Sequence, residues 1–117
     1  MMKVLLVDDD LLTLEWVTFL LHSQNIETRT ANSISAALQC LADWRPDVIV
    51  SDLSLHDDTA FSLLDHLQNG ATNHNIPVVV VTGHALDSAE RQRFQGYLTK
   101  PVEPEELLNV IRRYLPR

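Results

Sequence analysis

The sequence predicts an α/β protein in which helices cover both faces of a five-stranded parallel sheet. Short apolar runs rich in Val and Ile alternate with longer segments whose apolar residues recur at helical spacing. Acidic residues directly follow two of these runs, as at the ends of buried strands. The chain has 117 residues, 45% of them hydrophobic, which is enough for one core. We therefore expect residues 1–117 to form one domain.

The first strand and helix are predicted at the N-terminus. Val4–Val7 is an apolar run that ends at Asp8-Asp9-Asp10, and Leu11–His22 has helical periodicity. Asp10 stands where a side chain caps the first helical turn. The apolar positions that recur at helical spacing in this segment are Leu12, Trp16, Phe19 and Leu20.

Two further strand and helix pairs follow. Residues 26–31 alternate and carry β-favouring side chains, and residues 33–43 return to the helical period. A strand is predicted over residues 47–51, directly before Asp52. A helix over residues 60–69 ends at an Asn-Gly pair.

The last third of the chain predicts two strands and two helices. Residues 76–81 form the most β-branched run, and residues 96–98 a short strand. Between them, residues 85–94 form a weak, polar helix. The final helix, residues 104–114, begins at a proline followed by two glutamates and ends with two arginines, in agreement with helix polarity.

Polar residues at the strand ends predict a site. Parallel strands point the same way, so Asp8, Asp9, Asp52, Thr82 and Lys100 should gather along one edge of the sheet. In the flavodoxin-like strand order 2-1-3-4-5, the first and third strands are neighbours at about 4.8 Å. Both aspartates after the first strand are then within reach of one ion shared with Asp52.

The chemistry of this cluster predicts Mg²⁺, with Mn²⁺ as a possible replacement. Three neighbouring carboxylates repel one another, and a hard divalent cation with oxygen ligands removes that cost. An ionised carboxylate beside such a cation, a lysine and a hydroxyl can receive a phosphoryl group, since that transfer depends mainly on positioning and charge neutralisation. Asp52 is the central acceptor candidate.

These residues resemble the signature of response-regulator receiver domains of two-component signalling. The matching segments, which span essentially the whole chain, are Val7-Asp8-Asp9-Asp10, Val50-Ser51-Asp52-Leu53, Thr82-Gly83 and Lys100-Pro101. The resemblance implies that Asp52 is phosphorylated and that Lys100 pairs with the phosphoryl oxygens. It also implies Asp9 as a direct metal ligand, Asp8 as a ligand through water, and the backbone carbonyl of Ser54 as a further ligand.

The resemblance also implies a switch. Thr82 would donate its hydroxyl to the phosphoryl group, Tyr97 would rotate inward, and the surface of helix four, strand five and helix five would change. The implied partners are a sensor histidine kinase or phosphotransfer protein, and an output domain or effector protein. The domain would not be an enzyme beyond assisting its own phosphorylation and dephosphorylation.

Two features depart from the family pattern. His56 and Ala60 stand in the loop after Asp52 where a proline and a glycine are usual. The spacing of 18 residues from Thr82 to Lys100 is shorter than the family pattern, which predicts a short or irregular fourth helix. The effect of both departures on switching is open.

Composition excludes several classes. With 9 Lys and Arg against 16 Asp and Glu, the formal charge of -7 argues against direct binding to nucleic acid or an anionic membrane. The single cysteine, Cys40, falls in an apolar-periodic segment, and the N-terminus has no room for a signal peptide, so a cytoplasmic protein is expected. A zinc site is not expected because no ligand spacing joins His22, His56, His66, His74 and His84.

Three alternatives to a phosphorylated switch each meet a difficulty in the sequence. A degenerate receiver acting as an interaction module would agree with the two departures, but the acceptor, acid pair, threonine and lysine are all present. A Mg²⁺-dependent phosphatase would need a threonine where Leu12 stands. A flavin-binding protein would need a polar phosphate loop where three aspartates stand. The sequence leaves open the cognate kinase, the output pathway, the oligomeric state, and whether the domain stands alone or comes from a longer regulator or hybrid kinase.

Overall fold

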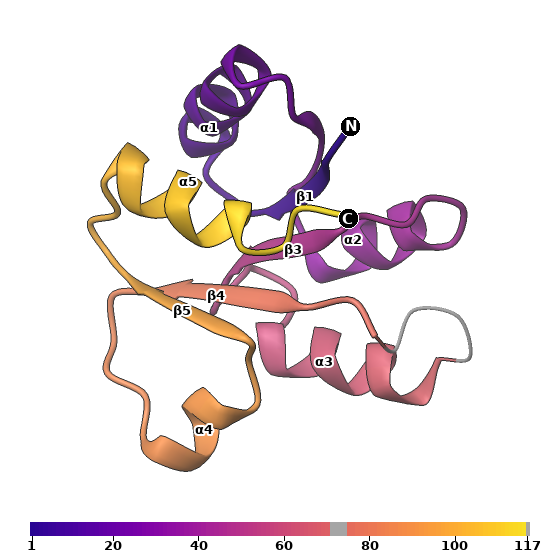
Figure 1. Cartoon of the computed structure of the whole chain (residues 1–117). Helices are drawn as coiled ribbons and strands as arrows, with labels where there is room; N and C mark the ends of the chain where they lie inside the picture. The colour runs from indigo at the N-terminus through magenta and orange to yellow at the C-terminus, as the bar shows by residue number, and fades with distance from the viewer. Residues whose placement is uncertain (71–74, 117) are drawn as a thin grey trace.

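The computed structural model describes residues 1–70 and 75–116, in which five parallel strands form one sheet of order β2-β1-β3-β4-β5 (Figure 1). The strands are Lys3–Val7 (β1), Glu27–Ala31 (β2), Val48–Asp52 (β3), Val78–Thr82 (β4) and Gly96–Thr99 (β5). The helices are Leu11–Ser23 (α1), Ile34–Leu41 (α2), Ala60–Asn69 (α3), Ser88–Gln92 (α4) and Pro104–Arg112 (α5). The predicted fold class and strand order are confirmed.

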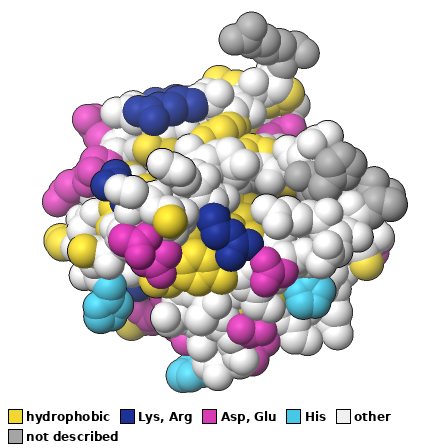
Figure 2. Space-filling view, turned by 90° about the horizontal axis from the view of Figure 1, so that it is seen from below, with side chains coloured by type: hydrophobic (Ala, Val, Ile, Leu, Met, Phe, Trp, Pro, Cys, Tyr) yellow, Lys and Arg dark blue, Asp and Glu magenta, His cyan; other side chains and the backbone are white. Residues whose placement is uncertain are grey.

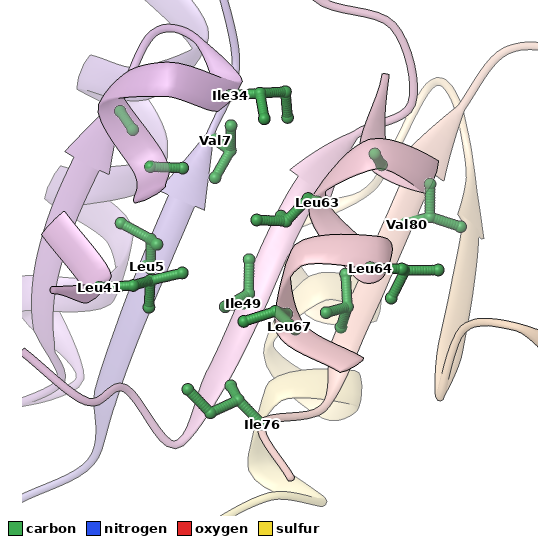
Figure 3. Close-up of a cluster of buried hydrophobic side chains, with 14 of the residues drawn as sticks. Leu5, Val7, Ile34, Leu41, Ile49, Leu63, Leu64, Leu67, Ile76 and Val80 are labelled. Carbon is green, nitrogen blue, oxygen red and sulfur yellow. The ribbon is translucent and has the colours of Figure 1, made fainter. Parts of the chain in front are cut away.

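The sheet separates two hydrophobic cores. Helices α1 and α5 cover one face, and α2, α3 and α4 lie on the other (Figure 1). Successive strand residues point to opposite faces, so Val4 and Leu6 of β1 pack towards α1 and α5, whereas Leu5 and Val7 pack towards α2 and α3. Figure 3 shows the second of these cores, where Ile49 of β3 lies between side chains from β1 and α3. Burial on both faces explains why the inner strands are mostly apolar.

Side chains before the helices fix where the helices begin. The Asp10 carboxylate accepts the backbone N–H of Leu12 at 3.1 Å, as expected, and starts α1 directly after the strand end. The Ser33 hydroxyl accepts the N–H of Ala36 at 3.0 Å at the start of α2. Each cap satisfies a helix donor that would otherwise lack a partner.

The apolar positions whose spacing predicts α1 are mostly not the ones that it buries. Leu12 and Phe19 are 74% and 78% exposed, and Trp16 is also exposed. The residues of α1 that are buried against the sheet are Leu14, Val17 and Leu21. Because α1 is apolar on nearly all sides, helical periodicity alone fits more than one face. The face left in water is apolar.

The short α4 predicted from the spacing before Lys100 is confirmed. It has five residues, and none of them is buried. Strand β4 begins at Val78, later than predicted, because Pro77 has no N–H to contribute to the sheet. Within the described part of the chain, no helix is long and apolar enough to cross a membrane.

Candidate functional site

The strand register brings the predicted site residues to one edge of the sheet. Val7 pairs with Ser51 between β1 and β3, so Asp8 and Asp52 follow neighbouring positions. Asp52 pairs with Val81 between β3 and β4, one residue before Thr82. Thr82 pairs with Thr99 between β4 and β5, which places Lys100 one residue beyond the pair.

Three carboxylates meet at this edge. One oxygen from each of Asp8, Asp9 and Asp52 lies within 4.8 Å of the other two. Asp8 is fixed from two sides, because its N–H donates to the carbonyl of Ala31 at 3.0 Å and its Oδ1 accepts the N–H of Asp10 at 2.9 Å. The side chain of Asp52 is only 12% exposed. The three oxygens therefore stand close enough to share one cation.

Lys100 reaches the predicted acceptor. Its Nζ lies 2.8 Å from Oδ1 of Asp52, and its backbone N–H donates to the carbonyl of Thr82 at 3.0 Å. Burial lowers the pKa of Lys100, but the hydrogen bond to Asp52 and the charges of the three carboxylates outweigh this and raise it above the ordinary value. The ammonium is thus held in its charged form beside the acceptor.

The electrostatics of Asp8 suit a bound cation. Burial raises the pKa of Asp8, the hydrogen bond from Asp10 lowers it, and repulsion by Asp52 raises it again, with a net rise. A net rise means that the negative charge is not fully compensated by the neighbouring protein groups. A hard divalent cation with oxygen ligands offsets that charge, so the donor set fits Mg²⁺ or Mn²⁺.

Thr82 and Tyr97 are joined through the backbone of His84. Thr82 is 2% exposed, and its Oγ1 accepts the N–H of His84 at 3.0 Å. The hydroxyl of Tyr97 donates to the carbonyl of His84 at 3.2 Å. The guanidinium of Arg91, on α4, lies 4.6 Å from the centre of the Tyr97 ring. The two predicted switch residues are therefore connected by hydrogen bonds to the same backbone residue, His84.

The loop after Asp52 is closed by hydrogen bonds that sequence reasoning missed. Ser54 forms an isolated antiparallel bridge with Thr59, and Leu55 N–H donates to the carbonyl of Asp58 at 2.9 Å. The carboxylate of Asp57 accepts the backbone N–H groups of Ile34 and Ser35, both at 3.0 Å, at the start of α2. These two donors hold the pKa of Asp57 below its ordinary value.

Another contact that the sequence did not predict joins His56 and Asp9. The Nε2 atom of His56 lies 3.6 Å from Oδ2 of Asp9. The only signal in the sequence was that His56 departs from the family pattern. His22, His66 and His84 are exposed like His56, and His74 lies outside the described residues.

A cavity of about 560 Å³ opens beside the carboxylates on the side of α1 and α5. Asp8, Asp52 and Lys100 line one part of it. The other part is mostly apolar and includes Trp16 of α1. The sequence did not predict this cavity, because helical spacing alone does not say which side of an apolar helix faces the sheet.

Comparison with known proteins decides the family. The family model for the response regulator receiver domain matches residues 4–112. The chain belongs to this family. As a receiver domain, it is 36% identical over 121 residues to the heme response regulator HssR of Staphylococcus aureus, covering 100% of this chain but only 53% of that protein.

Solved structures of receiver domains have the same fold. The chemotaxis response regulator CheY4 of Vibrio cholerae is 29% identical with a TM-score of 0.88, and the match covers 98% of this chain and 99% of that one. The receiver domain of the sensor histidine kinase PA1611 of Pseudomonas aeruginosa, solved with magnesium coordinated in its active-site cleft, is 21% identical with a TM-score of 0.85, covering 97% and 96%. The latter likeness bears on the fold alone.

Proposed function

We propose that residues 1–117 form one phosphoacceptor receiver domain, which accepts a phosphoryl group on Asp52 with Mg²⁺ and switches the α4, β5 and α5 face. The observation that carries this proposal is the contact of 2.8 Å between Lys100 Nζ and Asp52 Oδ1, made beside two further carboxylates. Phosphoryl transfer requires positive charge beside the attacking group, and here a lysine forms an ion pair with an aspartate that lies next to a metal-binding cluster.

Asp9 would bind Mg²⁺ directly, Asp8 through water, and Asp52 through its carboxylate, with Mn²⁺ as a replacement. Ser54 follows β3 in the bridged loop and would add its backbone carbonyl. When bound, the ion supplies positive charge to the carboxylates and to the incoming phosphoryl oxygens. The proposed ligands are all oxygen atoms, as Mg²⁺ prefers.

The transfer step belongs to Asp52. A carboxylate oxygen of Asp52 attacks the phosphorus of a phosphohistidine, the new O–P bond forms, and the electron pair of the broken P–N bond returns to the imidazole. Lys100 then exchanges its contact with Asp52 for the phosphoryl oxygens. The phosphoryl group carries about -1.5 to -2 units of charge and replaces the single negative charge of the Asp52 carboxylate at the edge of the sheet. Asp52 is itself modified in this transfer, and its carboxylate returns only when water later hydrolyses the acyl phosphate, so we do not regard the domain as an enzyme.

The added charge would act on Thr82 first. Its hydroxyl accepts the N–H of His84 and would turn to donate to the phosphoryl group. Movement of His84 would also break the bond that its carbonyl accepts from Tyr97, which frees the ring to rotate inward. The moved surface would then contact an output domain or effector protein, and a sensor histidine kinase or phosphotransfer protein would supply the phosphoryl group.

The test is phosphorylation of the whole chain by acetyl phosphate and Mg²⁺, read by intact mass. We expect the gain of one phosphoryl group, dependent on Mg²⁺, and its loss in Asp52→Asn. Asp58→Asn is the matched control because Asp58 lies in the same loop but outside the carboxylate cluster, and this variant should still be modified. If the wild-type chain stays unmodified under conditions that modify a control receiver, the proposal is wrong.

A further inference from the structure

His56 is placed beside the carboxylate cluster by a loop that is held on both sides of it. Asp57 is bound to two backbone donors at the start of α2, and Leu55 is bound to Asp58. The imidazole itself is 89% exposed and has its Nε2 3.6 Å from Oδ2 of Asp9. It therefore stands on the open side of the cluster, next to the carboxylate proposed as a direct metal ligand.

The distance between Nε2 and Oδ2 agrees with two ligands of one ion. Two donor atoms bound at about 2.1 Å lie about 3.0 Å apart at a right angle and about 3.6 Å apart at an angle of about 120°. His56 is not among the residues whose ligand atoms all lie within 4.8 Å of one another, so its exposed side chain must rotate towards Asp8 and Asp52 to reach an ion that the three carboxylates share. The carbonyl and hydroxyl groups elsewhere in the loop could offer a metal ion only oxygen ligands.

An imidazole nitrogen changes which ions such a site prefers. Mg²⁺ binds oxygen and gains little from a nitrogen donor, whereas Co²⁺, Ni²⁺ and Zn²⁺ bind imidazole well. We propose that His56 is a metal ligand that shifts the selectivity of the Asp8, Asp9 and Asp52 site towards divalent transition metals. The inference rests on the proposed function only in requiring that these carboxylates bind a metal.

The proposal is tested by binding of Mg²⁺ and Co²⁺ to the unphosphorylated full chain at about pH 8, where imidazoles are neutral. Trp16 lines the same cavity as Asp8 and Asp52, so its fluorescence reports on the site. We expect His56→Ala to weaken Co²⁺ binding at least tenfold, about 1.4 kcal/mol, and to change Mg²⁺ binding less than twofold. The visible absorption of bound Co²⁺ should also lose the contribution of a nitrogen ligand.

His66→Ala is the matched control, because His66 is an exposed histidine on α3 away from the cluster. It should alter neither affinity. The proposal is overturned if Mg²⁺ binds but His56→Ala leaves the ratio of the two affinities unchanged, or if His66→Ala changes it equally. If the wild-type chain binds neither ion, the carboxylate metal site of the proposed function fails as well.

Discussion

Helices α3 and α4 follow neighbouring strands of the site and lie on the same face of the sheet, yet they are held differently. Helix α3 has ten residues and buries Ala60, Leu63, Leu64 and Leu67. Helix α4 has five residues and buries none. It is held instead by a capping box between Asp87 and Glu90 and by Arg91 over the ring of Tyr97. Figure 2 views the molecule from this side and shows charged side chains around an exposed hydrophobic patch.

The difference indicates where the molecule can change shape at low cost. Moving α3 would expose a packed core, whereas moving α4 breaks only contacts at the surface. The loop before α3 is fixed by hydrogen bonds to α2, and the loop before α4 is fixed by the hydroxyl groups of Thr82 and Tyr97. The proposed acceptor, Asp52, thus lies beside the rigid helix α3, and the proposed switch lies beside α4, which can move at lower cost.

The largest effect should come from truncation in α3. Leu63 is fully buried, so Leu63→Ala should lower the free energy of unfolding by about 2–5 kcal/mol in urea titrations. Ala89→Gly in α4 should lower it by about 1 kcal/mol or less, because only helix propensity is lost at an exposed position. Equal losses in the two variants would contradict the contrast between the helices.

A smaller effect is expected in β5, the strand beside α4. A Cβ atom at Gly96 would lie 2.9 Å from Cγ2 of Val79, so Gly96→Ala should cost about 1–3 kcal/mol in the same titrations. Gly83, in the loop before α4, has no atom within 4 Å of such a Cβ, and Gly83→Ala should be nearly neutral. A clear loss of unfolding free energy in Gly83→Ala would contradict the open space that the structure shows around this loop residue.

The link from Asp57 to α2 predicts a dependence on pH. Its folded pKa is held below the unfolded value of about 3.9 by two backbone donors, so its stabilisation is fully present above that value and is lost as the pH falls through the folded pKa. Asp57→Ala should therefore be less stable than wild type at neutral pH, and the difference should shrink in acid. Asp57→Asn keeps an acceptor oxygen, and its free energy of unfolding should lie between those of wild type and Asp57→Ala. A stability difference between wild type and Asp57→Ala that does not depend on pH would argue against the link.

The smallest effect should follow removal of Arg91. Its contact with Tyr97 is worth about 0.5–1 kcal/mol at an exposed site, so Arg91→Ala should leave global stability nearly unchanged. We expect faster hydrogen exchange at the His84 N–H, which Thr82 accepts. Arg93→Ala is the control, because Arg93 pairs with Asp65 on α3 at 2.7 Å and should leave that exchange rate unchanged.

The site edge could be predicted because it depends only on strand order and direction. Once the strands are parallel, Asp8, Asp52 and Lys100 must follow their ends on the same side. The contacts of His56 and Asp57 could not be predicted, because they join residues far apart in sequence. His56 contacts Asp9, and Asp57 binds donors at Ile34 and Ser35, 23 and 22 residues away. The buried face of α1 could not be predicted for a different reason, because apolar residues stand on most sides of this helix and their spacing fits more than one face.

The exposed face of α1, with Leu11, Leu12, Trp16 and Phe19, has a thermodynamic consequence. Water ordered around apolar side chains contributes heat capacity that is lost when the surface is covered. A molecule that covers this face would therefore bind with an enthalpy that becomes more negative as temperature rises. An ion bound among the carboxylates covers little apolar surface and would bind with an enthalpy that changes much less. Calorimetry at several temperatures can thus tell events at these two adjoining surfaces apart.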